Sequence, residues 1–184
     1  YFVFGNHNLN EFHYYHSGVS APSEKREDAH GHGAAYCGFR VIRDKALSFT
    51  DPATGKKTPL LIAGVSGSRK YNNGLNQYSE REMKRRLIAM IPSLLWNKLR
   101  YGRYLDIFLT HASPRGIHDR EDPCHVGFEC FNWFIKKFSP AYLVHGHIHL
   151  YDIRTKRVTE TGATTVVNAY AHWLIDFPKT GAAQ

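Results

Sequence analysis

The segment Tyr142–His149 reads YLVHGHIH, and the interpretation of the rest of the chain starts from it. Its first, mostly apolar residues predict a short buried strand, and the histidines follow where that strand ends. His147 and His149 are two residues apart. On an extended segment they would point the same way, whereas on a tight turn at Gly146 they can reach two adjacent ions. So dense a run of imidazoles is an unusual way to build a core, and it favours metal binding over a His-rich surface loop.

Two other predicted strands end in side chains of the same kind. Asp106–Thr110 leads into His111, and the apolar stretch Tyr1–Phe4 leads through a glycine into Asn6 and His7. In α/β proteins, ligands usually bind at the C-terminal ends of strands. Three strand ends that each deliver a potential ligand therefore predict one shared site.

Strands and helices alternate along most of the chain, which predicts an α/β sandwich in a single domain over residues 1–184. Ser79 and Glu82 have the spacing of a capping box, so a helix should begin there. Pro92 is expected to kink this helix or to start a second one. The segment Gly127–Phe138 predicts another helix, whose aromatic face packs in the core. The predicted strands are Tyr1–Phe4, Tyr36–Ile42, Ala46–Phe49, Pro59–Val65, Tyr104–Leu109, Ala141–Val144, Leu150–Arg154, Thr164–Asn168 and His172–Phe177.

The chain carries a formal charge of +8 with its histidines neutral, so phosphorylated compounds or nucleic acid are reasonable partners. The positive charges are scattered, however. The densest groups, at residues 84–86 and 136–137, fall in predicted helices, where a solvated helix face is favoured over a binding patch. No basic stripe interleaved with aromatic residues is present, which makes nucleic acid the less favoured partner. No apolar run of about 18 residues is present either, so no membrane span is expected.

The three cysteines, Cys37, Cys124 and Cys130, are odd in number and include no Cys-x-x-Cys pair. This argues against a disulfide scaffold and against a thiolate zinc site. Buried structural thiols are the expected role for all three. A reducing compartment follows most simply, and we expect a cytoplasmic protein.

The order of the three histidine motifs resembles the calcineurin-like metallophosphoesterases. GNH at residues 5–7, the strand-end His111 and GHIH at residues 146–149 follow one another as in that superfamily from its GNH motif onward. A bacterial-type branch has further similar stretches: THASPRGIHD at 110–119, GS at 67–68, YNNG at 71–74 and VNAY at 167–170. The resemblance covers most of the chain. It implies an α/β fold with a metallophosphoesterase-type β-sandwich flanked by helices, with the first strands missing from this chain.

The resemblance also implies roles for individual residues. In that superfamily, two divalent ions lie close together, bridged by a carboxylate and a solvent oxygen. The motif matches imply that Asn6, His111 and His147 contact one ion. His149 would contact the other, and His7 would act near the leaving group as an acid or a charge stabiliser. The implied reaction is hydrolysis of a phosphate mono- or diester by a hydroxide that the two ions activate. The metal stays open among Mn, Fe, Zn and Ni.

The groups around the ions are less well defined. Arg69 or Arg115 could clamp the phosphate of a small-molecule or diester substrate, although each could equally be a surface charge. Asn8 stands where the superfamily usually has a carboxylate, and an amide cannot stabilise a positive imidazole as a carboxylate would. Glu11 is close enough in sequence to substitute. A role outside the site is favoured for four loop histidines: His30, His32, His118 and His125.

The other ligands of the superfamily, a DxH motif and a GD-type segment, precede GNH and have no counterpart in this chain. Asp44, Asp106, Asp119 and Asp122 sit in no such context. One interpretation is that the chain is the C-terminal part of a domain whose remainder lies upstream or on a second chain. The other is a degenerate, non-catalytic relative that serves as a scaffold or interaction protein. The start inside an apolar strand favours the first. A nuclease would use the same site, and the scattered charge lowers that alternative.

The absent bridging carboxylate leads to a prediction about activity. The 184-residue chain alone should hydrolyse bis-p-nitrophenyl phosphate poorly, whereas a version with the upstream segment should show Mn²⁺-dependent hydrolysis. Full activity of the purified 184-residue chain would contradict this expectation. Metal analysis separates the enzyme from the scaffold, because the enzyme should bind close to two ions and the scaffold none.

Overall fold

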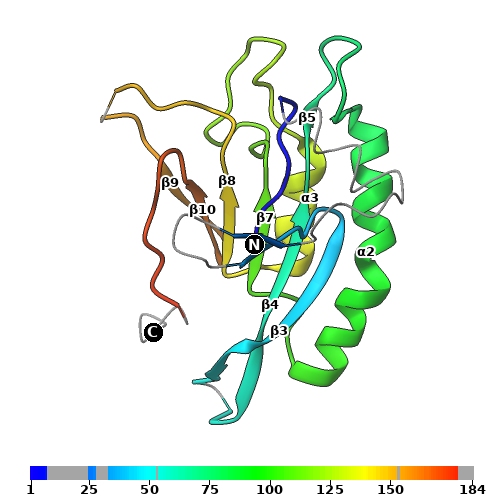
Figure 1. The fold of residues 1–184 in the computed structure, drawn as a ribbon, viewed down its shortest axis with the longest axis vertical. Helices are drawn as coiled ribbons and strands as arrows, with labels where there is room; N and C mark the ends of the chain where they lie inside the picture. Colours follow the sequence, from blue (N-terminus) through cyan, green and yellow to red (C-terminus); the bar gives the residue numbers. More distant parts are fainter. Residues whose placement is uncertain (8–24, 28–32, 53, 153, 178–184) are drawn as a thin grey trace.

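The structure is a computed structural model that describes residues 1–7, 25–27, 33–52, 54–152 and 154–177. It is built on a six-stranded sheet with the strand order β3-β4-β7-β8-β10-β9 (Figure 1). The four inner strands run parallel, and the two outer strands, β3 and β9, are antiparallel to their neighbours. The strands are β3 (Arg40–Thr50), β4 (Lys57–Val65), β7 (Ile107–Thr110), β8 (Tyr142–His145), β9 (Val158–Thr161) and β10 (Thr164–Asn168). The predicted mixed α/β class is therefore confirmed.

Two small sheets accompany the large one in the described part of the chain. Strands β1 (Lys25–Glu27) and β2 (Gly33–Ala35) pair antiparallel. Strands β5 (Ser68–Arg69) and β6 (Gln77–Tyr78) pair parallel directly after β4. Asn8, Glu11, His30 and His32 lie outside the described residues.

Helix α2 (Glu80–Tyr101) lies between β4 and β7 in sequence, and it begins at the predicted capping box. The side chain of Ser79 accepts a hydrogen bond from the backbone of Glu82, whose carboxylate caps the Ser79 backbone in return. Helix α2 continues through Pro92 to a left-handed cap at Gly102, so the proline does not start a second helix. Proline removes one helical hydrogen bond, but buried Met90 and Leu94 extend the apolar stripe past it. No helix in the described part of the chain is long and apolar enough to cross a membrane.

The two helices of the described residues, α2 and α3 (Glu129–Phe138), pack on one face of the sheet. Paired residues of the four inner strands, Ala63, Phe108, Leu143 and Val166, form a row across the sheet and belong to the same buried cluster. Buried side chains of both helices complete that cluster.

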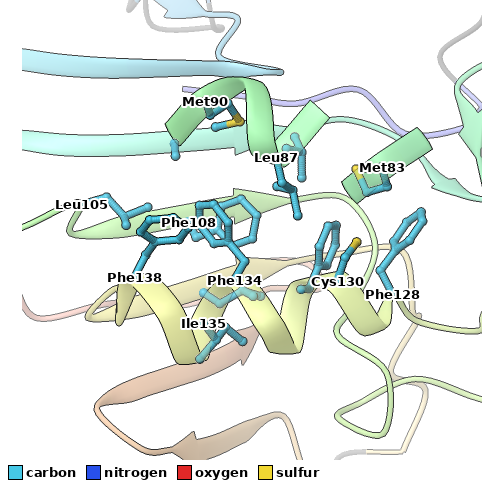
Figure 2. Packing of buried hydrophobic residues seen from close by; sticks show 14 of the residues in the cluster. Met83, Leu87, Met90, Leu105, Phe108, Phe128, Cys130, Phe134, Ile135 and Phe138 are labelled. Carbon is cyan, nitrogen blue, oxygen red and sulfur yellow. The ribbon is translucent and has the colours of Figure 1, made fainter. Parts of the chain in front are cut away.

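Helix α3 (Glu129–Phe138) contributes the predicted aromatic face, which is confirmed as core packing. The rings of Phe108 and Phe134 lie 4.3 Å apart, centroid to centroid. Figure 2 shows Leu87 and Met83 of α2 facing Phe134 and Cys130 of α3 across this core.

The register of the parallel strands brings their C-terminal ends to one edge. Val65 pairs with Thr110, Leu109 pairs with Val144, and the last residue of β10 pairs with His145. The residues that follow β4, β7, β8 and β10 therefore come out side by side. Segment 1–7 runs toward the same end of the sheet (Figure 1).

Several predicted strands differ from the structure. Within the described residues, the segment Tyr1–Phe4 makes a single bridge, between Phe2 and Tyr36, and forms no strand, although Phe4 is buried. The two strands expected over 36–42 and 46–49 are one strand, β3, with an irregularity between Asp44 and Phe49.

The C-terminal strands also differ in part. Thr164–Asn168 is confirmed as β10, but the described residues of Leu150–Arg154 and His172–Phe177 form no strand. Strand β9 was not predicted. Its residues are only partly buried, so they lack a core-facing apolar pattern. A turn at Gly162, with φ of 58°, folds β9 back onto β10.

Asp106 is buried, and it ties the start of β7 to β4. Its carboxylate accepts a hydrogen bond from the Leu61 backbone at 2.8 Å and two from the Arg103 guanidinium at 2.5 and 2.9 Å. As expected from sequence, this carboxylate lies at the opposite end of β7 from His111. Its role in the structure is to pin the strands that carry the site.

Removing this carboxylate should destabilise the fold. Asp106→Ala removes two hydrogen bonds from the partly buried Arg103 guanidinium and leaves the Leu61 amide without its carboxylate acceptor. The loss should cost about 2–3 kcal/mol of unfolding free energy in urea titrations. The matched control is Asp152→Ala. Its ion pair with Arg154 is exposed, so the loss should stay below about 1 kcal/mol. Equal losses in the two variants would contradict the structural role given to Asp106.

Candidate metal centre

Three of the predicted ligands meet at the edge where the strands end. The Oδ1 atom of Asn6 lies 3.2 Å from Nε2 of His111, and that nitrogen lies 2.9 Å from Nδ1 of His147. Asn6 is buried and both imidazoles are at least partly buried. These residues come from segment 1–7, from the end of β7 and from the turn after β8. In sequence, His111 is 105 positions from Asn6 and 36 from His147, so the fold alone brings them together.

The spacing of the three atoms suits one divalent cation. Oxygen and nitrogen ligands about 2.1 Å from a metal, at about a right angle, lie about 3.0 Å from each other. The observed separations of 2.9 and 3.2 Å are close to this value. Hydrogen bonds alone account for this cluster less well. Nε2 of His111 carries at most one hydrogen, which can be donated well to Oδ1 of Asn6 or to Nδ1 of His147 but not to both.

The amide of Asn6 has a defined orientation. Its Nδ2 group lies 3.0 Å from the hydroxyl of Tyr71 and 3.4 Å from Nε2 of His7, and an amide nitrogen can only donate. The amide oxygen is therefore the atom that faces His111. Tyr71 was not predicted to have this role, although it lies in the YNNG stretch.

The ring of His147 is also fixed by a hydrogen bond on its outer side. Its Nε2 lies 2.7 Å from the backbone carbonyl of Cys124, so this nitrogen carries the proton and donates it. Burial lowers the pKa of His147, which favours the neutral ring. The lone pair then lies on Nδ1, the atom that faces His111. A backbone carbonyl behind the second nitrogen is the usual support for a metal-binding histidine.

The backbone at this turn differs from the expectation placed on Gly146. The left-handed residue is His147 itself, with φ of 65°, whereas a Cβ at Gly146 would meet no atom within 4 Å. A non-glycine residue in this region carries backbone strain. The strained conformation thus belongs to the residue that presents the imidazole.

Gly5 has no room for a side chain. A Cβ built at Gly5 would come within 2.5 Å of Cε1 of His111. Burial lowers the pKa of His111 to about 3, and the neighbouring His147 and His7 contribute to this shift. His111 is therefore neutral at physiological pH, with a lone pair available to a cation.

His149 lies beside these groups but points elsewhere. It is exposed, it stacks on Tyr170 at 4.9 Å between centroids, and its Nδ1 contacts the hydroxyl of Tyr151 at 3.0 Å. Its charge acts on both His111 and His147, so it lies in the same neighbourhood. The structure therefore brings Asn6, His111 and His147 into contact and leaves His149 outside that contact.

A model of the calcineurin-like phosphoesterases matches residues 1–151 of the chain, which is most of its length and includes every predicted site residue. The chain belongs to this family. Its members are in general metal-dependent hydrolases of phosphate esters that bind divalent ions.

Solved structures of low identity are also similar. One is TT1561 of Thermus thermophilus, at 19% identity and a TM-score of 0.43, covering 74% of this chain and 49% of that one. A second has 21% identity and a TM-score of 0.46, covering 73% of this chain and 45% of that one. The chain thus spans about half the length of these structures. A search of curated proteins finds no match.

His145, the histidine that precedes the GHIH segment, has a structural role. It is buried, and its Nδ1 donates to the carbonyl of Gly146 at 3.0 Å. Its Nε2 must then accept from Nδ1 of His118 at 3.0 Å, and Nε2 of His118 accepts from the hydroxyl of Thr159 at 2.9 Å. Burial lowers the pKa of His145 to about 3 and that of His118 to about 4, so this chain of hydrogen bonds is neutral. It fixes the end of β8 against β9.

The two candidate substrate-binding arginines are both ion-paired. Arg69 contacts Glu80 at 2.6 Å, and that carboxylate also accepts hydrogen bonds from the first amides of α3. Arg115 contacts Asp119 and Glu121, each at 2.8 Å. Either arginine would have to leave a carboxylate to bind a phosphate, so their role in the family's chemistry stays a prediction.

Besides Tyr71, two further supporting groups were not predicted, Arg120 and the carbonyl of Cys124. The guanidinium of Arg120 donates to the backbone carbonyl of His149 at 3.1 Å. Both groups lie in the loop between β7 and α3. Every residue has a backbone carbonyl, so the identity of residue 124 could not indicate this hydrogen bond. A hydrogen bond between segments distant in sequence could not be derived from either segment alone.

The close approach of Gly5 to His111 gives a test of this candidate metal centre. Gly5→Ala should push the His111 ring away from Asn6 and lower the affinity for Mn²⁺ by about tenfold or more in calorimetric titrations. Gly146→Ala is the matched control. It adds the same methyl group near the same centre, but into open space, so its affinity should stay within about twofold of wild type. Equal affinities for wild type and Gly5→Ala would contradict the assignment of His111.

Proposed function

We propose that the chain forms the imidazole-and-amide side of a metal-dependent phosphoesterase centre that hydrolyses phosphate mono- or diesters. The observation that carries this proposal is the convergence of Asn6 Oδ1, His111 Nε2 and His147 Nδ1, at separations of 2.9 and 3.2 Å. The family of the chain supports the reaction class.

In this proposal, Asn6, His111 and His147 hold one divalent ion and His149 contributes to a second. Divalent ions at such a centre supply Lewis acidity that activates water and offsets negative charge on the phosphoryl oxygens. The ligand set of imidazole and amide suits Mn, Fe, Zn or Ni. The two neutral imidazoles keep their lone pairs for the ion because burial holds both pKa values down.

His7 is the proposed proton donor to the leaving group. It is exposed, and its Nε2 accepts from the Asn6 amide at 3.4 Å. When the ring is neutral, its proton therefore lies on Nδ1. An exposed N–H on the residue next to a metal ligand can reach the oxygen of a departing group, or stabilise its charge when the ring is protonated.

The organic part of the ester has a place beside His149. A cavity of about 600 Å³ there is lined by Tyr151, Tyr170 and Trp173, among other residues. Tyr151 and Tyr170 also contact the His149 ring. A cavity with aromatic walls beside His149 favours substrates that carry an organic group beyond the phosphate.

The second ion needs more ligands than His149. In the described part of the chain, no carboxylate makes a hydrogen bond or ion pair with Asn6, His111, His147 or His149. We propose that the bridging and remaining carboxylates come from residues outside those that the structure describes. Two ions per molecule, and not one, is the stoichiometry this proposal requires.

Activity of the full-length protein tests the proposal. With Mn²⁺ present, His147→Ala should lower kcat/KM on bis-p-nitrophenyl phosphate by at least about a hundredfold, because it removes a ligand. The matched control is His172→Ala, at an exposed histidine whose ring makes no hydrogen bond or ion pair within the described residues. It should keep activity within about twofold.

A wild-type rate for His147→Ala at limiting metal would overturn the proposed site. An inactive wild-type protein that binds no metal would instead support a scaffold. Circular dichroism of both variants confirms that each is folded.

A further inference from the structure

A second group of potential ligands lies in the loop that contacts Nε2 of His147. Asp122, Cys124 and His125 belong to the loop between β7 and α3, and their ligand atoms all lie within 4.8 Å of one another. The Cys124 thiol lies 2.8 Å from Oδ1 of Asp122, His125 Nδ1 lies 2.7 Å from the same oxygen, and the sulfur and nitrogen are 3.6 Å apart. These groups are distinct from the proposed phosphoesterase centre. The backbone of Cys124 meets His147 at Nε2, whereas the proposed centre uses Nδ1 of the same ring.

The spacing of the sulfur and the nitrogen suits zinc. With bonds of about 2.3 Å to sulfur and about 2.05 Å to nitrogen, a tetrahedral Zn²⁺ places these atoms about 3.6 Å apart. The observed separation is the same. Oδ1 of Asp122 lies about 0.7 Å closer to this sulfur and this nitrogen than it would as a third ligand of a tetrahedral Zn²⁺. The Asp122 side chain is 43% exposed, so it can turn outward by that amount.

The chemistry of the three groups also suits zinc. A thiolate, an imidazole and a carboxylate are all common Zn²⁺ ligands, and the two negative charges balance the charge of the ion. On binding, bonds form from the ion to Sγ, Nδ1 and one carboxylate oxygen. The thiol proton leaves to solvent, and the His125 proton moves through water from Nδ1 to Nε2. The fourth position is open to solvent.

We propose that Asp122, Cys124 and His125 form a Zn²⁺ site that supports the adjoining centre. The carbonyl of Cys124 accepts the hydrogen bond from His147 at 2.7 Å. An ion bound to the side chain of Cys124 therefore fixes the backbone group that orients His147. The ring of His125 lies 5.1 Å from that of His147, centroid to centroid. His147 therefore meets two parts of the proposed zinc loop, the carbonyl of Cys124 and the ring of His125. This inference does not rest on the proposed phosphoesterase activity.

The expectation from sequence that no thiolate zinc site exists rested on the absence of cysteine pairs. A single thiolate combined with a carboxylate and an imidazole escapes that criterion. The three residues fall within four positions, and a turn closed by the Asp122 carbonyl and the His125 amide at 3.0 Å folds them together.

Cobalt titration of the folded, metal-free protein tests the site. Co²⁺ should produce a thiolate-to-metal charge-transfer band in the near ultraviolet, and Cys124→Ala should abolish it. His111→Ala, which alters only the phosphoesterase centre, should keep the band. Cys130→Ala is the matched thiol control, because Cys130 is buried in the core and should also leave the band intact. No band in the wild type, or a band that survives Cys124→Ala, would overturn the proposal.

Thiol labelling gives an independent readout that needs no variant. Cys37 and Cys130 are 0% and 3% exposed, whereas Cys124 is accessible, so iodoacetamide should label Cys124 first. Zn²⁺ at about ten times its dissociation constant should slow this labelling about tenfold, measured by mass spectrometry. Labelling at an unchanged rate under saturating Zn²⁺ would show that the loop is held by hydrogen bonds alone.

Discussion

The in-register pairing of the parallel strands is the constraint on which the candidate centre depends. Val65, Thr110 and the end of β8 lie in adjacent positions across the sheet, so the residues that follow them emerge at one edge. A shift of one residue in any pair would turn a ligand to the opposite face. The buried carboxylate of Asp106 helps to fix that register from the other end of β7, where it binds the amide of Leu61. Segment 1–7 then completes the site, because Gly5 has no side chain and lets the backbone lie directly on the His111 ring.

Burial also controls the protonation of the histidines in and around this centre. Imidazoles are useful to a cation only when neutral, and desolvation holds the pKa of His111 and of His145 at about 3, below the ordinary value of 6.5. The unfolded chain therefore binds more protons than the folded one between pH 6.5 and about 3. Stability from these two residues is present above pH 6.5 and is lost as the pH falls through that window. The same burial that prepares His111 for a metal thus opposes folding in acid.

Much of the fold could be predicted from sequence, and the reasons for success and failure are local. The capping box at Ser79 and the apolar run of β4 each carry their own signal, and both are confirmed. Strand β9 was missed because an edge strand of Thr and Glu has little apolar pattern. The alternative that Pro92 starts a second helix is wrong, because packing on both sides of the proline outweighs one lost hydrogen bond. For the site, the order of the motifs indicated which residues should meet, and the structure brings Asn6, His111 and His147 into contact. The supporting groups could not be predicted, because a hydroxyl from Tyr71 and a backbone carbonyl from Cys124 act across long separations in sequence.

The central claim is that Asn6, His111 and His147 bind a divalent cation. A crystal structure of the protein grown with Mn²⁺, with anomalous diffraction to locate the ions, tests it most directly. The account predicts an ion about 2.0–2.3 Å from Asn6 Oδ1, His111 Nε2 and His147 Nδ1, with Nε2 of His147 still hydrogen-bonded to Cys124. Anomalous density elsewhere, with these three atoms bonded only to one another or to solvent, would contradict it.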